Sequence, residues 1–343
     1  MNNNSHKLYY IDMVKAIGII LLIIGHQTSG TLLQSAIYSF HMPLFVIVSG
    51  FLIQYNTGYA KSFKDLLVRK ARSLLVPYIT FGFFLIFYGI LCKVLNYSCW
   101  YFLSYKQIIS LTFNQIIGYG IGTLWFLPFL FCIEIIVWIL MKLEKRVAIL
   151  ILFFLVAIAY CSGGLAQNLV YSNIKVYVAV GEILTVICRV AIGLPFAIFG
   201  IFLCRMFALL NEKRIVVFSV FSFFIWSISV LIMNSPMVDL FSLNIPNVLL
   251  YYMNAITGSF WIITLCKNCF DKKTHFAELF GGGSLLFMVF NNLPSNSAIY
   301  DGFTIIIGKQ IPCLEIFSIL ISETILVLIF RNSKCLKKIF FLR

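Results

Sequence analysis

Three ionisable side chains, Asp12, Lys15 and His26, lie in one apolar stretch near the start of the chain. An α-helix turns by about 100° per residue, so the eleven positions from Lys15 to His26 return to the same face. Asp12 falls within about 40° of that face. A rise of 1.5 Å per residue puts His26 about 16 Å beyond Lys15 along the axis. The sequence therefore predicts one polar stripe, with His26 as a candidate general base at its far end.

A second histidine, His41, stands in the segment FHMPLF about two turns into the next predicted helix. That helix runs back, so the depth of His41 should resemble that of His26. Two imidazoles at similar depth on neighbouring antiparallel helices can share a cavity, and imidazole is the commonest general base near neutral pH. The alternative interpretation of His41 is a structural histidine bonded to a backbone carbonyl.

Two arginines, Arg69 and Arg72, precede the third predicted helix in RKARSLLVPY. They are three residues apart, so one helical face presents both guanidiniums. Such a pair suits phosphate, which arginine binds in a planar bidentate manner. The alternative is that both residues only set the membrane topology. Cys266 and Cys269 form a single CxxC without a second pair, so we expect no metal site.

The composition is that of a membrane protein. Hydrophobic residues make up 61% of the chain and charged residues 11%, with a mean hydropathy of +0.99. A soluble domain carries about 25% charged residues. The apolar runs are long and continuous rather than alternating, and a spanning helix needs roughly 20 such residues. We therefore expect a single all-α domain over residues 1–343, with ten transmembrane helices near 11–29, 34–55, 74–95, 116–141, 148–164, 179–204, 215–234, 248–266, 277–294 and 311–330. Segment 303–311 either extends the last helix or forms a short re-entrant piece.

The basic residues orient these spans. Alternate loops and the tail hold 20 of the 26 Lys and Arg residues, which is the positive-inside asymmetry of cytoplasmic regions. The sequence therefore predicts a cytoplasmic N-terminus over 1–10 and a basic cytoplasmic tail over 331–343. It also accounts for the net charge of +14 without a nucleic-acid partner.

Further ionisable residues lie within the later predicted spans. Glu182 and Arg189 are seven residues apart, two helical turns, and we expect them to pair. Glu315 and Glu323 lie in the last predicted span without a predicted partner.

The motifs around these residues, taken together, resemble the opening of the acyltransferase family 3 membrane proteins. They are YYIDMVKAIGIILLIIGH, with Lys15 and His26 in the family's spacing, then FHMPLFVIVSGFL and RKARSLLVPY. GTLWFLPFLF is similar to the branch that includes fucose 4-O-acetylase-like proteins. The motifs cover roughly residues 9–80 and 122–131. Relatives often carry a histidine just beyond the Gly–Ser–Leu at 283–285, where this chain has Asn291 and Asn292.

The resemblance implies a multi-pass enzyme of the bacterial plasma membrane. Such an enzyme transfers acetyl from acetyl-CoA, a substrate rather than a tightly bound cofactor, to a hydroxyl of a cell-surface polysaccharide or its lipid-linked precursor. The acceptor would be a capsule, exopolysaccharide or O-antigen unit. Arg69, Arg72 and Lys15 would hold the CoA phosphates. His26, with His41 and Asp12, would act on the acceptor hydroxyl or carry the acyl group itself.

A proton-coupled transporter or glycan exporter is the alternative, because ionisable residues within spans also mark transport paths. That class predicts repeated halves with paired broken helices, and no internal repeat is visible in the sequence. A structural membrane subunit would leave the stripe of Asp12, Lys15 and His26 without a purpose.

Overall fold

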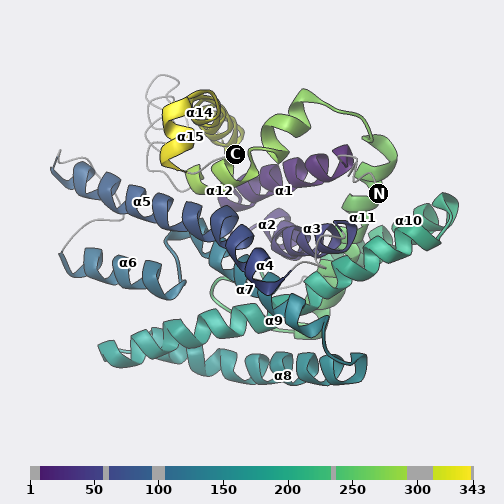
Figure 1. The fold of residues 1–343 in the computed structure, drawn as a ribbon, viewed down its shortest axis with the longest axis horizontal. Coiled ribbons are helices and arrows are strands. Elements are labelled where there is room, and N and C mark those ends of the chain that lie inside the picture. The colour runs from purple at the N-terminus through teal and green to yellow at the C-terminus, as the bar shows by residue number, and fades with distance from the viewer. Residues whose placement is uncertain (1–7, 57–61, 95–104, 233–236, 292–311, 341–343) are drawn as a thin grey trace. The chain divides into compact units, whose positions relative to one another are not determined.

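The computed structural model describes residues 8–56, 62–94, 105–232, 237–291 and 312–340, and these fold almost entirely into helices (Figure 1). The single β-type pairing among them is an isolated bridge between Asp239 and Asn244. Continuous apolar runs leave the backbone no partner in lipid except itself, so helices follow. The all-α prediction is confirmed for this part of the chain.

Among the residues that the structure describes, eight helical segments are long and apolar enough to cross a membrane, judged by length and composition. They are Tyr9–Gln27, Leu32–Tyr55, Phe63–Leu91, Tyr105–Leu140, Lys145–Val170, Lys175–Leu209, Glu212–Leu231 and Val248–Cys269. A multi-pass membrane protein is thus indicated. Ten spans and cytoplasmic ends stay a prediction, because the ninth and tenth predicted spans are not among the eight. Segment 303–311 and parts of both predicted cytoplasmic ends lie outside the described residues.

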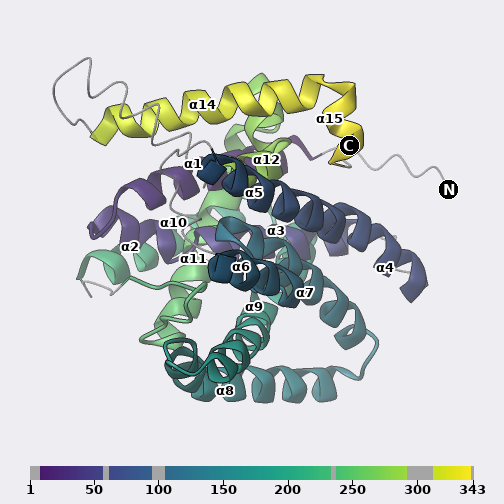
Figure 2. The ribbon, with the colours of Figure 1, turned by 90° about the vertical axis from the view of Figure 1, so that its left-hand side faces the viewer.

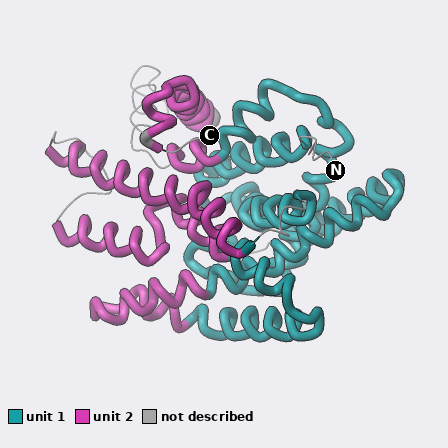
Figure 3. The backbone as a smooth tube through the Cα atoms, in the orientation of Figure 1, with its two compact units in different colours: residues 1–62, 133–164, 188–284 teal, residues 63–132, 165–187, 285–343 magenta. Residues whose placement is uncertain are grey.

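The chain forms two compact units, residues 1–62, 133–164 and 188–284 in the first and residues 63–132, 165–187 and 285–343 in the second (Figure 3). Unit 1 contains helices α1 (Tyr9–Gln27), α2 (Leu32–Tyr38), α3 (His41–Tyr55), α10 (Glu212–Ile232), α11 (Val248–Cys269) and the π-turn η4 (Ala277–Gly281). Helices α7 (Phe126–Leu140), α8 (Lys145–Val170) and α9 (Lys175–Leu209) contribute segments to both units.

Close backbone contacts hold unit 1 together. Helices α3 and α9 cross where each has a glycine, Gly50 and Gly200. A Cβ on Gly50 would overlap the carbonyl of Ala197, and a Cβ on Gly200 would overlap that of Ile47. Small residues allow such approaches between membrane helices. Helix α1 packs against α2, α3, α11 and η4, so it lies at the centre of this unit.

Unit 2 contains α4 (Phe63–Lys70), the π-turn η2 (Ala71–Leu75), α5 (Val76–Val94), α6 (Tyr105–Ile117), the 3-10 turn η3 (Gly122–Trp125), α12 (Ser284–Phe290), α14 (Pro312–Asn332) and α15 (Lys334–Ile339). Figure 2 shows α14 leading into the short α15. Tyr78 and Gln115 bond each other's backbone: the tyrosine hydroxyl donates to the Gln115 carbonyl at 2.6 Å, and the Gln115 amide donates to the Tyr78 carbonyl at 2.8 Å. These bonds fix α5 against α6.

Candidate active site

The turn between α1 and α2 decides how the first histidine is presented. Gly30 adopts φ of +74°, a backbone conformation that suits glycine, and its N–H donates to the side-chain oxygen of Gln34 at 2.8 Å. Thr31 caps α2, because its hydroxyl oxygen accepts from the Gln34 N–H at 3.1 Å. The polar residues of the loop thus fold α2 back beside the end of α1.

Gly25, the neighbour of His26, lets the last turn of α2 approach α1. A Cβ at Gly25 would stand 3.1 Å from the side chains of both Ile37 and Tyr38, tighter than ordinary contact. The end of α1 therefore places a candidate base, His26, next to Gly25, whose missing side chain lets α2 pack closely.

Tyr38 meets His26 across this contact. Its hydroxyl lies 3.2 Å from Nδ1 of His26, and the two rings are 5.9 Å apart in an edge-on arrangement. His26 is exposed at the end of α1. Its second nitrogen, Nε2, has no hydrogen-bond partner among the described residues and is open to a substrate.

His41 lies on the other side of Tyr38. Their ring centroids are 4.8 Å apart, and His41 Nδ1 donates to the Ile37 carbonyl at 3.0 Å. The His41 side chain is buried, with 3% of its surface exposed. The backbone bond that the structural interpretation of His41 expected is therefore present. It also gives a neutral His41 its proton on Nδ1. The two imidazoles are linked through Tyr38.

A loop over residues 237–247 lies at the same end of unit 1. The carboxylate of Asp239 accepts from the Phe241 N–H at 2.9 Å and the Ser242 hydroxyl at 2.7 Å. Arg189 holds this turn from α9, because its Nε donates to the Phe241 carbonyl at 2.7 Å and its guanidinium covers the Phe241 ring at 4.3 Å. Asp239 lies within electrostatic range of both His26 and Tyr38. We call His26, Tyr38, His41 and Asp239 the histidine end of unit 1.

Asp12 and Lys15 lie at the start of α1, where their charged atoms are 3.9 Å apart. Helix α1 is continuous from Tyr9 to Gln27, so the spacing of about 16 Å between Lys15 and His26 holds. Asp12 and Lys15 thus come together, whereas His26 lies about three turns away beside Tyr38. The stripe is divided between the two ends of α1.

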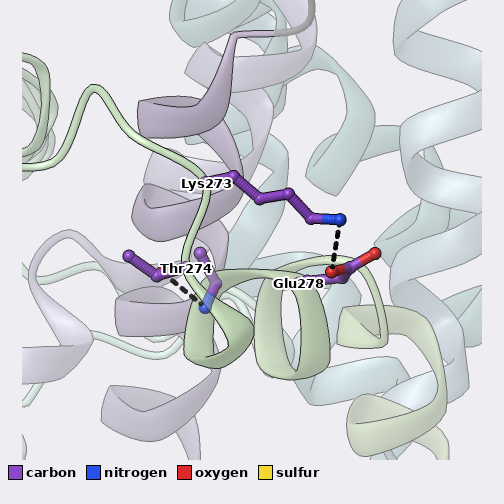
Figure 4. A network of polar contacts seen from close by, with 4 residues as sticks. Lys273, Thr274 and Glu278 are labelled. Carbon is purple, nitrogen blue, oxygen red and sulfur yellow. Dashed lines mark hydrogen bonds and ion pairs between the residues drawn. The ribbon is translucent and has the colours of Figure 1, made fainter.

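The π-turn η4 packs against the start of α1. A Cβ on Gly281 would overlap the backbone of Asp12. Figure 4 shows how η4 is fixed: the Lys273 ammonium pairs with the Glu278 carboxylate at 3.2 Å, and the Thr274 hydroxyl accepts from the Ala277 N–H at 3.2 Å. This arrangement leaves Asp12 no freedom to shift toward η4.

Basic residues from helices α9 and α11 and from the loop before η4 lie at the end of unit 1 where α1 starts. Arg205 donates two hydrogen bonds to Gln54 at the end of α3, at 3.0 and 3.2 Å. Lys267 at the end of α11 pairs with Glu212 at the start of α10, at 3.5 Å. Together with Lys273 beside η4, these residues form what we call the basic end. The antiparallel helices therefore separate these basic residues from His26 and His41.

Between the two ends, a buried carboxylate meets α3. The Ser49 hydroxyl donates to Glu134 of α7, whose side chain is 2% exposed. Ser49 follows His41 by eight residues on α3, about 12 Å along the axis. A buried carboxylate in a spanning helix is costly unless it is hydrogen-bonded, so Ser49 stabilises Glu134 here.

Arg69 and Arg72 belong to unit 2, where α4 ends at Lys70 and the π-turn η2 starts at Ala71. The α-helical register on which the prediction of a shared face depended is therefore interrupted between them. Both side chains are exposed and accessible to an anion. π-Turns are frequent at functional sites, which agrees with a binding role.

Tyr38 and Asp239 are the residues that the sequence did not single out. Tyr38 stands three residues before His41 in the chain, and their rings meet across the short break between α2 and α3. That spacing was the available signal. Asp239 had none, because it reaches the histidines only through the fold of a loop some two hundred residues further along the chain.

Comparison with known proteins assigns this arrangement to a family. The family model described as an acyltransferase domain, that of acyltransferase family 3, matches residues 8–297. The chain therefore belongs to acyltransferase family 3, and it is a membrane acyltransferase. No curated protein and no solved structure matches it. The proposed affiliation with the fucose 4-O-acetylase-like branch stays a prediction.

Proposed function

We propose that this protein is an O-acetyltransferase of the bacterial plasma membrane. It takes acetyl from cytoplasmic acetyl-CoA and transfers it to a hydroxyl of a cell-surface polysaccharide or its lipid-linked precursor. The family supplies the reaction class. The observation that carries the proposal is the exposed imidazole of His26 at the histidine end of unit 1. Its Nδ1 contacts the Tyr38 hydroxyl, and its Nε2 is open to a substrate.

The separation of the two ends of unit 1 supports the sidedness. Lys and Arg accumulate on the cytoplasmic side of membrane proteins. The basic end, with Arg205, Lys267 and Lys273, is then cytoplasmic, and the histidine end faces outward. A CoA headgroup would approach from the cytoplasm, while a lipid-linked glycan would reach His26 from the outer leaflet.

In the proposed step, Nε2 of His26 takes the proton of the acceptor hydroxyl. The hydroxyl oxygen bonds to the acetyl carbon, the carbon–sulfur bond breaks, and the departing CoA thiolate receives the proton from the imidazolium. Asp239 lies within electrostatic range of His26, so its negative charge attracts the imidazolium that forms in this step. In a second route His26 itself carries the acetyl group before the acceptor arrives.

The donor would be held by cations nearer the cytoplasm. Lys15 stands about 16 Å from His26 along α1 and is partly exposed. Arg69 and Arg72 are exposed on the segment that leads into α5. We propose that these residues bind the CoA phosphates and that Asp12 holds the Lys15 ammonium toward them.

The test is to replace His26 by alanine and to compare it with His275→Ala. His275 is an exposed histidine two residues beyond Lys273, at the basic end, and serves as the matched control. General base catalysis contributes about 10²- to 10⁴-fold, so transfer to a soluble acceptor sugar should fall by at least about 10²-fold in His26→Ala only. Wild-type activity in a well-accumulated His26→Ala protein would refute the mechanism.

A transporter is not favoured, because the family match covers most of the chain and describes an acyltransferase domain. The two classes separate in one assay. Acetylated product accumulates with an enzyme, whereas a transporter moves the glycan unmodified.

A further inference from the structure

Tyr38 has a role that neither the sequence motifs nor the family match assigns. We propose that Tyr38 is the positioning residue of His26: its oxygen accepts a hydrogen bond from Nδ1–H and so keeps the Nε2 lone pair free for the acceptor hydroxyl. This inference rests on the proposed function of His26 as the base.

A neutral imidazole carries one N–H and one acceptor nitrogen. The 3.2 Å contact between Tyr38 and Nδ1 can be made in two ways. If the tyrosine O–H donates to Nδ1, the proton of the ring stands on Nε2 and that nitrogen cannot act as a base. If Nδ1–H donates to the tyrosine oxygen, Nε2 has the lone pair. Only the second arrangement also suits the imidazolium that forms when the base takes a proton.

The contacts around Tyr38 hold its hydroxyl in place. On one side of its ring lies His41, at 4.8 Å and tied to the Ile37 carbonyl. Gly25 removes the side chain that would otherwise keep the ring away from α1. Helix α2 is itself fixed by its Thr31 cap. His41 is thus assigned to support Tyr38 rather than to touch the substrate.

A negative charge lies near Tyr38 and His26. Asp239 lies within electrostatic range of both Tyr38 and His26, and its carboxylate is already fixed by the turn at Phe241 and Ser242. A negative charge there attracts the imidazolium that His26 becomes when Nε2 takes the acceptor proton.

The experiment compares wild type with Tyr38→Phe, which removes one oxygen and keeps the ring between the imidazoles. Tyr252→Phe is the matched control, because its hydroxyl donates to the Ile192 carbonyl at 2.9 Å in the same unit, away from both histidines. The full-length protein carries ¹⁵N-labelled histidine, and His26→Ala identifies the His26 signals. The imidazole ¹⁵N shifts report which nitrogen holds the proton, and acetyl transfer gives kcat and KM for acetyl-CoA.

We expect His26 to carry its proton on Nδ1 in wild type and in Tyr252→Phe, and to lose that preference in Tyr38→Phe. The kcat of Tyr38→Phe should fall about tenfold, the worth of one hydrogen bond, while KM for acetyl-CoA stays unchanged. Thermal unfolding should match that of Tyr252→Phe.

A wild-type His26 with its proton on Nε2 would overturn the inference, as would a Tyr38→Phe protein with unchanged tautomer and kcat. The tautomer is read without turnover. A wild-type protein that transfers no acetyl group therefore refutes the proposed function separately, whatever the spectrum of His26 shows.

Discussion

Gly281→Ala tests whether the packing of η4 on α1 holds the start of the polar stripe in place. A Cβ at this position would overlap the Asp12 carbonyl oxygen, with the carbonyl carbon only 2.7 Å away. The obstacle is backbone, so a rotamer change cannot relieve it. The Lys273–Glu278 pair and the Thr274 bond to the Ala277 N–H also favour the present local conformation of η4.

The size of the effect follows from that overlap. Restoring ordinary contact requires a shift on the order of 1 Å between η4 and α1. Overpacking of this kind costs about 1–3 kcal/mol of folding stability. A displacement of about 1 Å can also lower a catalysed rate by about 10²-fold, because reacting groups lose their alignment. We therefore expect Gly281→Ala to unfold at lower temperature and to transfer acetyl far more slowly.

Gly164→Ala is the control, because it makes the same substitution within a helix of the same unit. No heavy atom lies within 4 Å of a Cβ placed there. Alanine is favoured over glycine in a helix by about 1 kcal/mol, so Gly164→Ala should unfold at an equal or higher temperature and keep its activity. Thermal unfolding in detergent and initial rates of acetyl transfer measure both variants. Unchanged unfolding and activity in Gly281→Ala would refute the packing described for α1 and η4.

Three further predictions concern the donor site, the topology and unit 2. Arg69→Ala and Arg72→Ala should each raise KM for acetyl-CoA about tenfold or more, with poor rescue by lysine, which lacks the bidentate fork; normal acetyl-CoA binding by titration calorimetry would contradict this. Cysteine reporters at Lys64 and Lys272 in a cysteine-free background should label only from the cytoplasmic side, and labelling from outside would reverse the topology. In unit 2, the Glu323 carboxylate accepts a hydrogen bond from the buried side-chain amide of Asn291 at 3.1 Å. Glu323→Leu should therefore lower the free energy of unfolding by about 1–3 kcal/mol, and Glu323→Gln should lower it less. Equal unfolding temperatures of the two variants would contradict this.

The sequence was most informative where structure depends on neighbours along the chain. Apolar runs predicted the helices, and the spacing of Lys15 and His26 survives because α1 is one regular helix. The backbone carbonyl considered for His41 proved to be that of Ile37, four residues earlier. Periodicity and local hydrogen bonding are properties of short segments, and a sequence displays them directly.

The sequence was least informative where a loop or an irregular turn places the residue. The contact between Tyr38 and His26 depends on the left-handed Gly30 and on the missing side chain of Gly25. Asp239 reaches the same place through a turn that Arg189 anchors. The π-turn that contains Arg72 is a local departure from the α-helical spacing that a periodicity argument assumes.

We propose that acetyl crosses from a cytoplasmic donor to an acceptor at the outer half of the membrane, with His26 as the base. Sealed vesicles of known orientation test it most directly. Labelled acetyl-CoA is supplied only on the cytoplasmic side and the acceptor glycan only on the outer side. Label should appear on the outer acceptor with the wild-type protein and not with His26→Ala. Transfer that requires both substrates on the cytoplasmic side would contradict the account.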